Sequence, residues 1–334
     1  MKPVLNDVLQ DLCTTPGPSG FERDIAQKAK AYLSPVSDSL TVDNVGNVIA
    51  RIDGTDPALK PVMVYAHMDR VGMIVSFVTE DGFLRLQAIG GVPDKVLPGS
   101  RVLVRTVSGA WQYGVVGTKC NHLMTEEEKQ RVQPMRELLV DVGADSAEQA
   151  KEMGFAIGCP VVYEPVYRRL GGRRVAATVW EEYNQRAAAM AVRRINPIAA
   201  ISMDMLLAGD TPDVKGVFEA SVGQGPVASH YNYSDGADNG TIAHPGLYAL
   251  AERTAAAHGT GLQHYVCYAS LGDNAYSQLT GDGPACIEIG APVRYAHSTT
   301  EVADLDDIEN LSLLVSEMVQ GMDASFVQAR YTLD

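Results

Sequence analysis

The sequence predicts an α/β fold: a mixed sheet flanked by helices, into which a second, β-rich and barrel-like domain is inserted. Helical and strand patterns alternate up to residue 70 and again from residue 163, as in an α/β domain. Between residues 71 and 162, short β-like runs alternate with turns such as Asp81-Gly82, as in a small barrel. A chain of 334 residues is long enough for two domains. We therefore expect a discontinuous α/β domain, 1–70 and 163–334, and an inserted domain, 71–162.

The first part of the α/β domain is expected to contain two helices and three strands. Leu5, Val8, Leu9 and Leu12 recur at helical spacing, which predicts an amphipathic helix. Ser19 and Glu22 have the spacing of a capping box, which predicts that the second helix starts there. Strands are predicted at residues 40–43, 47–52 and 61–66.

After the β-rich region the chain returns to alternating strands and helices. Apolar runs predict strands at residues 175–180, 198–203, 265–268 and 285–289. Helical spacing predicts helices at residues 187–194, 248–258 and 304–322. Chemistry in open α/β sheets collects beyond the carboxyl ends of the strands, so the residues that follow these runs are the first candidates for a site.

Composition excludes several classes of partner. The chain has 27 Lys and Arg against 41 Asp and Glu, a net charge of −14, which disfavours binding to nucleic acid or to an anionic membrane. The five cysteines are scattered and form no paired motif, so neither a disulfide framework nor a zinc knuckle is expected. The N-terminus lacks the apolar core of a signal peptide and no run is long enough to span a bilayer. We expect a cytoplasmic protein.

Three apolar runs end in potential metal ligands. One run ends at His67, the next at Glu181 and Glu182, and the third at Asp204. If these strands are parallel neighbours, their ends meet in one crevice, and His297, which follows the predicted strand 285–289, could complete the set. Imidazole and carboxylate ligands are typical of a catalytic zinc or cobalt hydrolase.

Each of these residues also has an ordinary structural explanation. A single His at a strand end is usually a hydrogen-bonding residue, adjacent glutamates are usually a solvated turn, and Asp204 could simply be a turn or capping residue. A glycosidase acting through Glu181 and Glu182 is disfavoured, because its two carboxylates must flank the scissile bond at roughly 5–9.5 Å. Adjacent residues of one strand point to opposite faces and rarely achieve this.

The chain resembles the tetrahedral (TET) metallo-aminopeptidases, a cytosolic group that includes relatives formerly labelled cellulases or endoglucanases. The resemblance covers nearly the whole chain. It is carried by Pro16-Gly17-Pro18-Ser19-Gly20, Asp43-Asn44-Val45-Gly46-Asn47, Ala66-His67-Met68-Asp69, Gly117-Thr118-Lys119, Asp141-Val142-Gly143-Ala144, Trp180-Glu181-Glu182, Ala208-Gly209-Asp210-Thr211-Pro212, Gly223-Gln224-Gly225-Pro226 and Arg294-Tyr295-Ala296-His297-Ser298.

The resemblance implies an aminopeptidase that acts on peptide substrates with two divalent ions, zinc or cobalt in the first place and manganese as an alternative. It implies that the metal ligands are His67, Glu182, Asp204 and His297. Asp69 would orient the His67 ring, and Glu181 would be the general base that takes a proton from the attacking water. It also implies that the inserted domain is used for dimerisation, and that dimers build a larger homo-oligomer such as a dodecamer.

One feature of the family is missing from this sequence. The family has a helix before the Glu pair that carries an Asp bridging the two metals, yet no Asp occurs between Cys159 and Glu182. The sequence does not single out a substitute such as Asp210, Asp235 or Asp273. Either the printed chain lacks a segment, or the protein has a weakened or single metal site. The second possibility gives an alternative hypothesis: a non-hydrolytic binding or assembly protein with the same fold.

Overall fold

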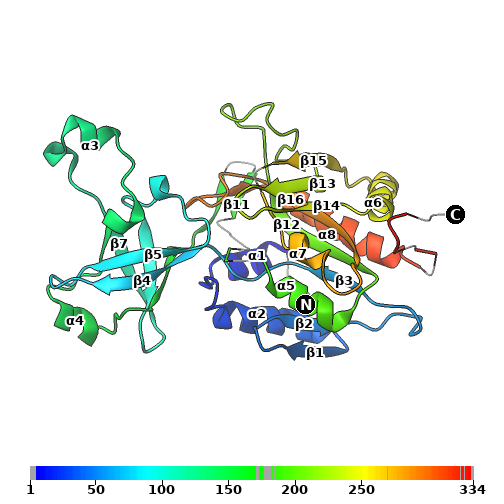
Figure 1. The fold of residues 1–334 in the computed structure, drawn as a ribbon, viewed down its shortest axis with the longest axis horizontal. Coiled ribbons are helices and arrows are strands. Elements are labelled where there is room, and N and C mark those ends of the chain that lie inside the picture. Colours follow the sequence, from blue (N-terminus) through cyan, green and yellow to red (C-terminus); the bar gives the residue numbers. More distant parts are fainter. Residues whose placement is uncertain are drawn as a thin grey trace.

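The computed structural model describes residues 5–170, 173–176, 182–183, 185–268, 270–323, 325–326 and 328–331. A helix-flanked mixed sheet and a separate closed barrel lie side by side, so the predicted fold class is confirmed (Figure 1). No helix within the described ranges is long and apolar enough to cross a membrane.

The mixed sheet has nine strands within the described residues. Its main path runs β10-β11-β17-β16-β12-β3, and β13 extends it by pairing with β16, β14 and β15. β3 and β16 both pair in parallel with β12. The strands are β3 (Val62–Tyr65), β10 (Tyr167–Leu170), β11 (Arg173–Ala176), β12 (Ala199–Leu207), β13 (Val227–Ser234), β14 (Asn239–Ile242), β15 (Gln263–Cys267), β16 (Ala285–Arg294) and β17 (Val302–Ala303).

The two faces of this sheet differ in character. Ile201 of β12 and Ile287 of β16 are fully buried in a core with α6 (Pro245–His258) and α8 (Leu305–Gln320). Because side chains alternate along a strand, the residues between them face the opposite side. Tyr65, Ser202 and Glu288 are register partners on three adjacent strands and share that opposite face. It is covered in part by α5 (Ala187–Ile195) and α7 (Asn274–Ser277) (Figure 1).

The N-terminal elements confirm part of the prediction. They are α1 (Leu5–Cys13), α2 (Arg23–Leu33) and the antiparallel pair β1 (Ser39–Val42) and β2 (Val48–Arg51), which is separate from the main sheet. The predicted capping box is wrong, because α2 has Glu22 as its N-cap residue and no side-chain cap. Ser19 instead donates a hydrogen bond to Asp69, 50 residues away, so its role is tertiary.

The barrel closes in the order β4-β5-β8-β7-β6-β9, and every adjacent pair is antiparallel. Its interior is filled by fully buried residues such as Met73, Leu84 and Val104. The strands lie between residues 72 and 163, and the domain boundaries stay a prediction. The barrel elements are β4 (Gly72–Val78), β5 (Leu84–Ile89), β6 (Arg101–Arg105), β7 (Trp111–Gly117), β8 (Leu139–Asp141), β9 (Pro160–Tyr163), α3 (Glu126–Gln130) and α4 (Ala147–Glu152).

The strand arrangement corrects two sequence expectations. β3 and β12 are parallel neighbours, as the convergence argument requires. β11, which precedes the Glu pair, instead pairs antiparallel with β10 and β17. Residues 177–181, including the rest of the predicted strand and Glu181, lie outside the described residues. β12 also continues to Leu207, so Asp204 lies within the strand and not at its end.

Candidate functional site

His67 and Asp204 lie together at one end of the mixed sheet. His67 follows the end of β3, and Asp204 belongs to the adjacent strand β12. The His67 Nε2 and Asp204 Oδ1 atoms are 3.6 Å apart, and both side chains are largely buried. The other ring nitrogen, Nδ1, lies 3.2 Å from Asp69 Oδ1. A carboxylate at Nδ1 favours the tautomer that leaves Nε2 as an acceptor facing Asp204.

Glu182 and His297 form a second pair of the same kind. The His297 Nε2 and Glu182 Oε1 atoms are 3.4 Å apart, and the Glu182 side chain is 2% exposed. Gly91, which follows β5 of the barrel, holds both residues. Its N–H donates to Glu182 Oε2 at 3.5 Å, and its carbonyl oxygen lies 3.0 Å from His297 Nδ1. The backbone at the edge of the barrel therefore forms one wall of the site.

Asp69 connects the two pairs. One carboxylate oxygen faces His67, and the other accepts hydrogen bonds from the Glu182 backbone N–H at 3.2 Å and from Ser19 Oγ at 2.6 Å. A carboxylate that accepts several bonds in fixed geometry holds its neighbours in one orientation. The backbone of Glu182 is thus attached to the His67 loop through Asp69.

His297 is held in a tight and strained turn. Tyr295 and His297 both have φ of 63°, a left-handed conformation that is uncommon for residues other than glycine. Two contacts stabilise it. Arg294 makes a two-point ion pair with Asp210, with Nε donating to Oδ1 at 2.7 Å, and the His297 N–H donates to Glu301 Oε1 at 2.7 Å. The turn fixes the direction of the His297 ring.

Acidic side chains are concentrated in and beside the site. Burial raises the pKa of Glu182 to about 9, with a further contribution from the charges of Asp69 and Asp204. Burial also raises the pKa of Glu288 to about 8, and the charges of Asp204 and Asp273 act in the same direction. Carboxylates that repel one another in a buried site are stabilised by a cation between them.

The possible ligand atoms form two pairs, and the distance within each pair fits a divalent ion. Within the described residues, no group of three or more His, Cys, Asp or Glu side chains is arranged to hold a metal. Two ligand atoms about 2.0–2.1 Å from a tetrahedral ion lie roughly 3.3–3.4 Å apart. The separations of 3.6 Å for His67–Asp204 and 3.4 Å for Glu182–His297 are close to that value. Glu182 Oε1 is buried without a hydrogen-bond partner in the described part of the chain.

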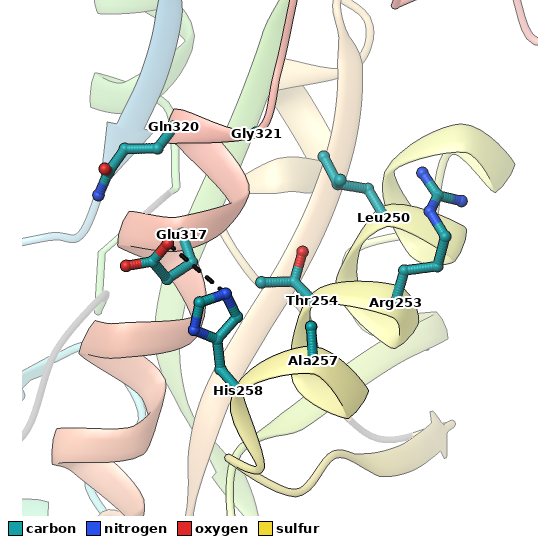
Figure 2. A pocket seen from close by; sticks show the side chains of 8 residues that line it. All are labelled: Leu250, Arg253, Thr254, Ala257, His258, Glu317, Gln320 and Gly321. Atoms are coloured by element: carbon teal, nitrogen blue, oxygen red, sulfur yellow. Dashed lines mark ion pairs between the residues drawn. The ribbon is translucent and has the colours of Figure 1, made fainter.

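A cavity of about 600 Å³ opens beside the second pair. Glu182 and His297 are on its wall together with Leu207, Leu271 and Tyr276. A smaller hollow of about 390 Å³ lies between α6 and α8, where His258 Nε2 and Glu317 Oε2 are 3.6 Å apart (Figure 2). It contains none of the candidate residues. The cavity beside Glu182 is therefore the candidate substrate pocket.

The sequence model of the M42 glutamyl aminopeptidase family matches residues 46–180 and 174–314. The chain belongs to this family. It is 31% identical to a lysyl aminopeptidase of Pyrococcus furiosus, over 94% of this chain and 96% of that protein. The TET aminopeptidase of the archaeon Thaumarchaeota archaeon SCGC AB-539-E09 is 27% identical, with a TM-score of 0.86 over 95% and 97% of the two chains. The Pyrococcus horikoshii TET1 peptidase, which assembles into a tetrahedron or an octahedral shell, is 25% identical, with a TM-score of 0.80 over 94% and 98%.

M42 relatives contain residues that have no counterpart here. The alignment with the lysyl aminopeptidase extends over 347 residues, which exceeds the 334 residues of the whole chain. The two segments of the family match meet at residues 174–180. The family's helix with the bridging Asp is expected before this stretch, and its absence from this sequence stays a prediction.

Sequence reasoning missed several residues that build the site. Gly91 contacts both Glu182 and His297, and a Cβ there would come within 2.8 Å of His297 Nδ1. The only local signal was a pair of adjacent glycines after a predicted strand. Ser19 was assigned to a helix cap, and Glu301 had no signal because its contact with His297 arises only from the fold of the turn.

Proposed function

We propose that this M42-family protein is a metal-dependent aminopeptidase that removes N-terminal residues from short peptides. The observation that carries the proposal is the presence of two His–carboxylate pairs, His67–Asp204 and Glu182–His297, joined through Asp69. The membership of the M42 aminopeptidase family gives the reaction class.

His67, Asp204, Glu182 and His297 would hold the ions, which we propose to be two zinc or cobalt ions, or manganese. When bound, such ions polarise the scissile carbonyl and lower the pKa of the attacking water. Asp69 holds the His67 ring through Nδ1 and the Glu182 backbone through its other oxygen. Its contribution is the orientation of both residues, since ligands held by a hydrogen-bonded carboxylate keep one geometry.

Glu181 is proposed as the general base. It directly precedes Glu182 in the sequence, and in the strand that the sequence predicts, neighbouring residues would point in opposite directions. One carboxylate can therefore serve as a ligand while the other takes a proton from the attacking water and passes it to the leaving amine. General acid–base catalysis of this kind contributes about 10²–10⁴-fold to the rate.

The proposed activity requires a group that recognises the free N-terminus of a peptide. We propose that the free amine of the peptide N-terminus is received by a metal or an acidic side chain of this site, and an internal peptide bond offers no free amine. The cavity beside Glu182, about 600 Å³ in volume, gives room for a short peptide.

The test is hydrolysis of chromogenic aminoacyl substrates after chelation and re-addition of zinc, cobalt or manganese. We expect activity only with metal, and a loss of about 10²–10⁴-fold in kcat for Glu181→Gln with unchanged metal content. A full-length protein that is inactive with every metal contradicts the proposal.

The alternative function is a non-hydrolytic binding or assembly protein. It is favoured by the absence, within the described residues, of any group of three metal-binding side chains. Elemental analysis separates the two functions. About two tightly held ions per chain support the enzyme, as a two-metal site requires. A well-folded protein without bound ions supports the alternative.

We also propose that the barrel serves as a dimerisation domain and that dimers build a larger homo-oligomer. The support comes from the TET1 relative, which assembles into a tetrahedron or an octahedral shell. The barrel lies to one side of the mixed sheet (Figure 1). Tyr113 and Val115 of its strand β7 are exposed.

A further inference from the structure

The wall of the cavity beside Glu182 includes two segments that are distant in the sequence. One follows Glu182 directly and contributes Gln185 and Arg186. The other lies between β15 and α7 and contributes Leu271. The cavity adjoins Glu182 and His297, which are proposed metal ligands. A peptide whose N-terminus lies at the metal site would therefore place the side chain of its first residue beside these segments.

Gln185 joins the two segments. Its side-chain Nε2 donates a hydrogen bond to the Leu271 carbonyl oxygen at 2.7 Å, although the two residues are 86 positions apart in the sequence. Its backbone has φ of 54°, a left-handed conformation that is uncommon for residues other than glycine. Backbone strain of this kind persists only where contacts hold it, and the bond to Leu271 is such a contact.

The loop that carries Leu271 is also held by the mixed sheet. Gly272, the next residue, packs so closely on the Glu288 carboxylate of β16 that any Cβ at this position would overlap it. Asn274 of α7 accepts a hydrogen bond from Tyr65 Oη of β3. Leu271 itself is 7% exposed. The loop is thus held from both sides, which makes the Leu271 side chain a fixed part of the cavity wall.

The described residues of this wall offer little charge to a substrate side chain. Their one carboxylate is Glu182, which is 2% exposed and is a proposed metal ligand, so it is not free to pair with a basic side chain. Their one guanidinium belongs to Arg186, which is exposed and lies 5.1 Å from the centre of the Tyr276 ring. An ion pair at an exposed position contributes little, because water screens it.

The other described side chains of the wall, apart from His297, are uncharged. Leu207, Leu271 and the Tyr276 ring provide apolar surface, and Ser234 and Ser270 provide hydroxyl groups. An apolar side chain is stabilised when such surface removes it from water. A charged side chain would lose hydration here without gaining a buried partner.

We propose that this cavity receives the side chain of the substrate's N-terminal residue, that it selects apolar side chains such as that of leucine, and that Gln185 is the positioning residue that holds the Leu271 wall. The inference rests on the proposed function, because it names the class of peptide on which the proposed aminopeptidase acts.

The first experiment compares leucyl, glutamyl and lysyl p-nitroanilides as substrates of the metal-loaded wild-type protein. We expect kcat/KM for the leucyl substrate to exceed both other values by at least about 10-fold, which is within the range that contacts in an apolar pocket supply. A preference for the glutamyl substrate would overturn the proposal and would indicate that Arg186 recognises an acidic side chain. A preference for the lysyl substrate would overturn it as well.

The second experiment tests Gln185 with leucyl and alanyl substrates. Gln185→Ala removes the donor to the Leu271 carbonyl oxygen, so we expect KM for the leucyl substrate to rise about 3–10-fold. KM for the alanyl substrate should change little, because a methyl group makes few contacts with the wall. The value of kcat and the metal content should stay the same, since no proposed ligand is altered.

Two further variants make this result specific. Gln185→Asn keeps an amide and tolerates the left-handed backbone, but its side chain is one methylene shorter, so it should behave like Gln185→Ala. Gln133→Ala is the control, because it removes a bond of the same kind outside the cavity, from Gln133 Nε2 to the Glu137 carbonyl oxygen at 3.2 Å. It should leave both KM values unchanged. Circular dichroism verifies the fold of each variant.

The outcomes separate this inference from the proposed function. If the wild type is active, and the two Gln185 variants change KM for the leucyl and alanyl substrates equally or not at all, the role of Gln185 is overturned and the proposed function is left intact. A metal-loaded wild type that is inactive on every substrate contradicts both.

Discussion

Asp69 and Gly91 show how single residues organise the candidate site from outside the set of expected ligands. Asp69 faces His67 with one oxygen and the Glu182 backbone with the other. Gly91 contacts Glu182 through its N–H and His297 through its carbonyl oxygen. Asp69 was predicted to orient His67 and its position agrees with that role, which stays a prediction. Gly91 was not predicted.

A substitution of Gly91 tests how a single residue positions His297. An added Cβ would lie 2.8 Å from His297 Nδ1 and 3.1 Å from Cε1, so the ring must move. Because His297 is a proposed ligand, we expect Gly91→Ala to weaken metal binding by about 10–100-fold, measured by calorimetric titration.

The matched control is Gly54→Ala, at a glycine where a Cβ meets no atom within 4 Å. Both variants should keep the circular dichroism spectrum of the wild type. Equal metal affinity for Gly91→Ala and Gly54→Ala would show that His297 does not act as a ligand in the described geometry.

At the scale of elements, side chains alternate in direction along β12 and β16, and this alternation separates an apolar core from a polar face. Ile201 and Ile287 pack under α6 and α8, whereas Ser202 and Glu288 turn to the other side. Glu288 is 1% exposed and accepts a hydrogen bond from Asn232 of β13. A buried acid in the centre of a sheet makes the stability of the metal-free protein depend on pH.

The sign of this dependence follows from the raised pKa of Glu288, about 8 in the folded protein against an ordinary value of 4.5. Between these values the folded state keeps a proton that the unfolded state has released, so the free energy of unfolding falls as pH rises from about 5 to 8. Glu288→Gln cannot titrate and should show a smaller fall in urea unfolding of metal-free protein.

The difference between the two proteins should grow by about 1.4 kcal/mol for each unit by which folding raises the pKa of Glu288. Glu309→Gln, at an exposed position of α8, serves as the control and should follow the wild type. If the free energy of unfolding falls equally with pH in the wild type and in Glu288→Gln, Glu288 has an ordinary pKa in the folded protein.

At the scale of the whole molecule, the closed barrel stands beside the mixed sheet and contacts the site through Gly91 (Figure 1). Its interior is apolar, but some apolar side chains also point outward. Tyr113 is 69% and Val115 48% exposed on the same face of β7. Exposed apolar patches often mark protein interfaces.

We expect light scattering of the purified protein to give a mass above that of one chain. Tyr113→Glu combined with Val115→Glu should lower this mass, because the added charges would be buried in the proposed interface. Lys60→Glu, an exposed substitution outside the barrel, is the control and should leave the mass unchanged. A monomeric wild type, or an unchanged mass for the double variant, contradicts the proposed use of this face.

Local pattern predicted much of the architecture. The alternating elements of the α/β part and the short strands of the barrel follow directly from apolar spacing and turns. β13 and β14 were missed, because the run from residue 227 to 234 mixes His, Asn and Ser with aromatic residues and lacks a regular apolar alternation. Ser19 was misassigned because its partner, Asp69, is distant in the sequence.

The sequence by itself determined the family, the fold class and the set of residue types at the site. The family motifs consist of residues that are neighbours in sequence. The burial pattern of a helix or a strand likewise repeats along successive residues. Only the tertiary structure decided which carboxylates lie together. Asp210, Asp235 and Asp273 are equivalent in sequence, yet in the fold Asp210 pairs with Arg294, Asp235 accepts a hydrogen bond from Tyr268, and Asp273 is buried. Proximity between distant residues depends on strand register and on which face each side chain takes, and neither is encoded locally.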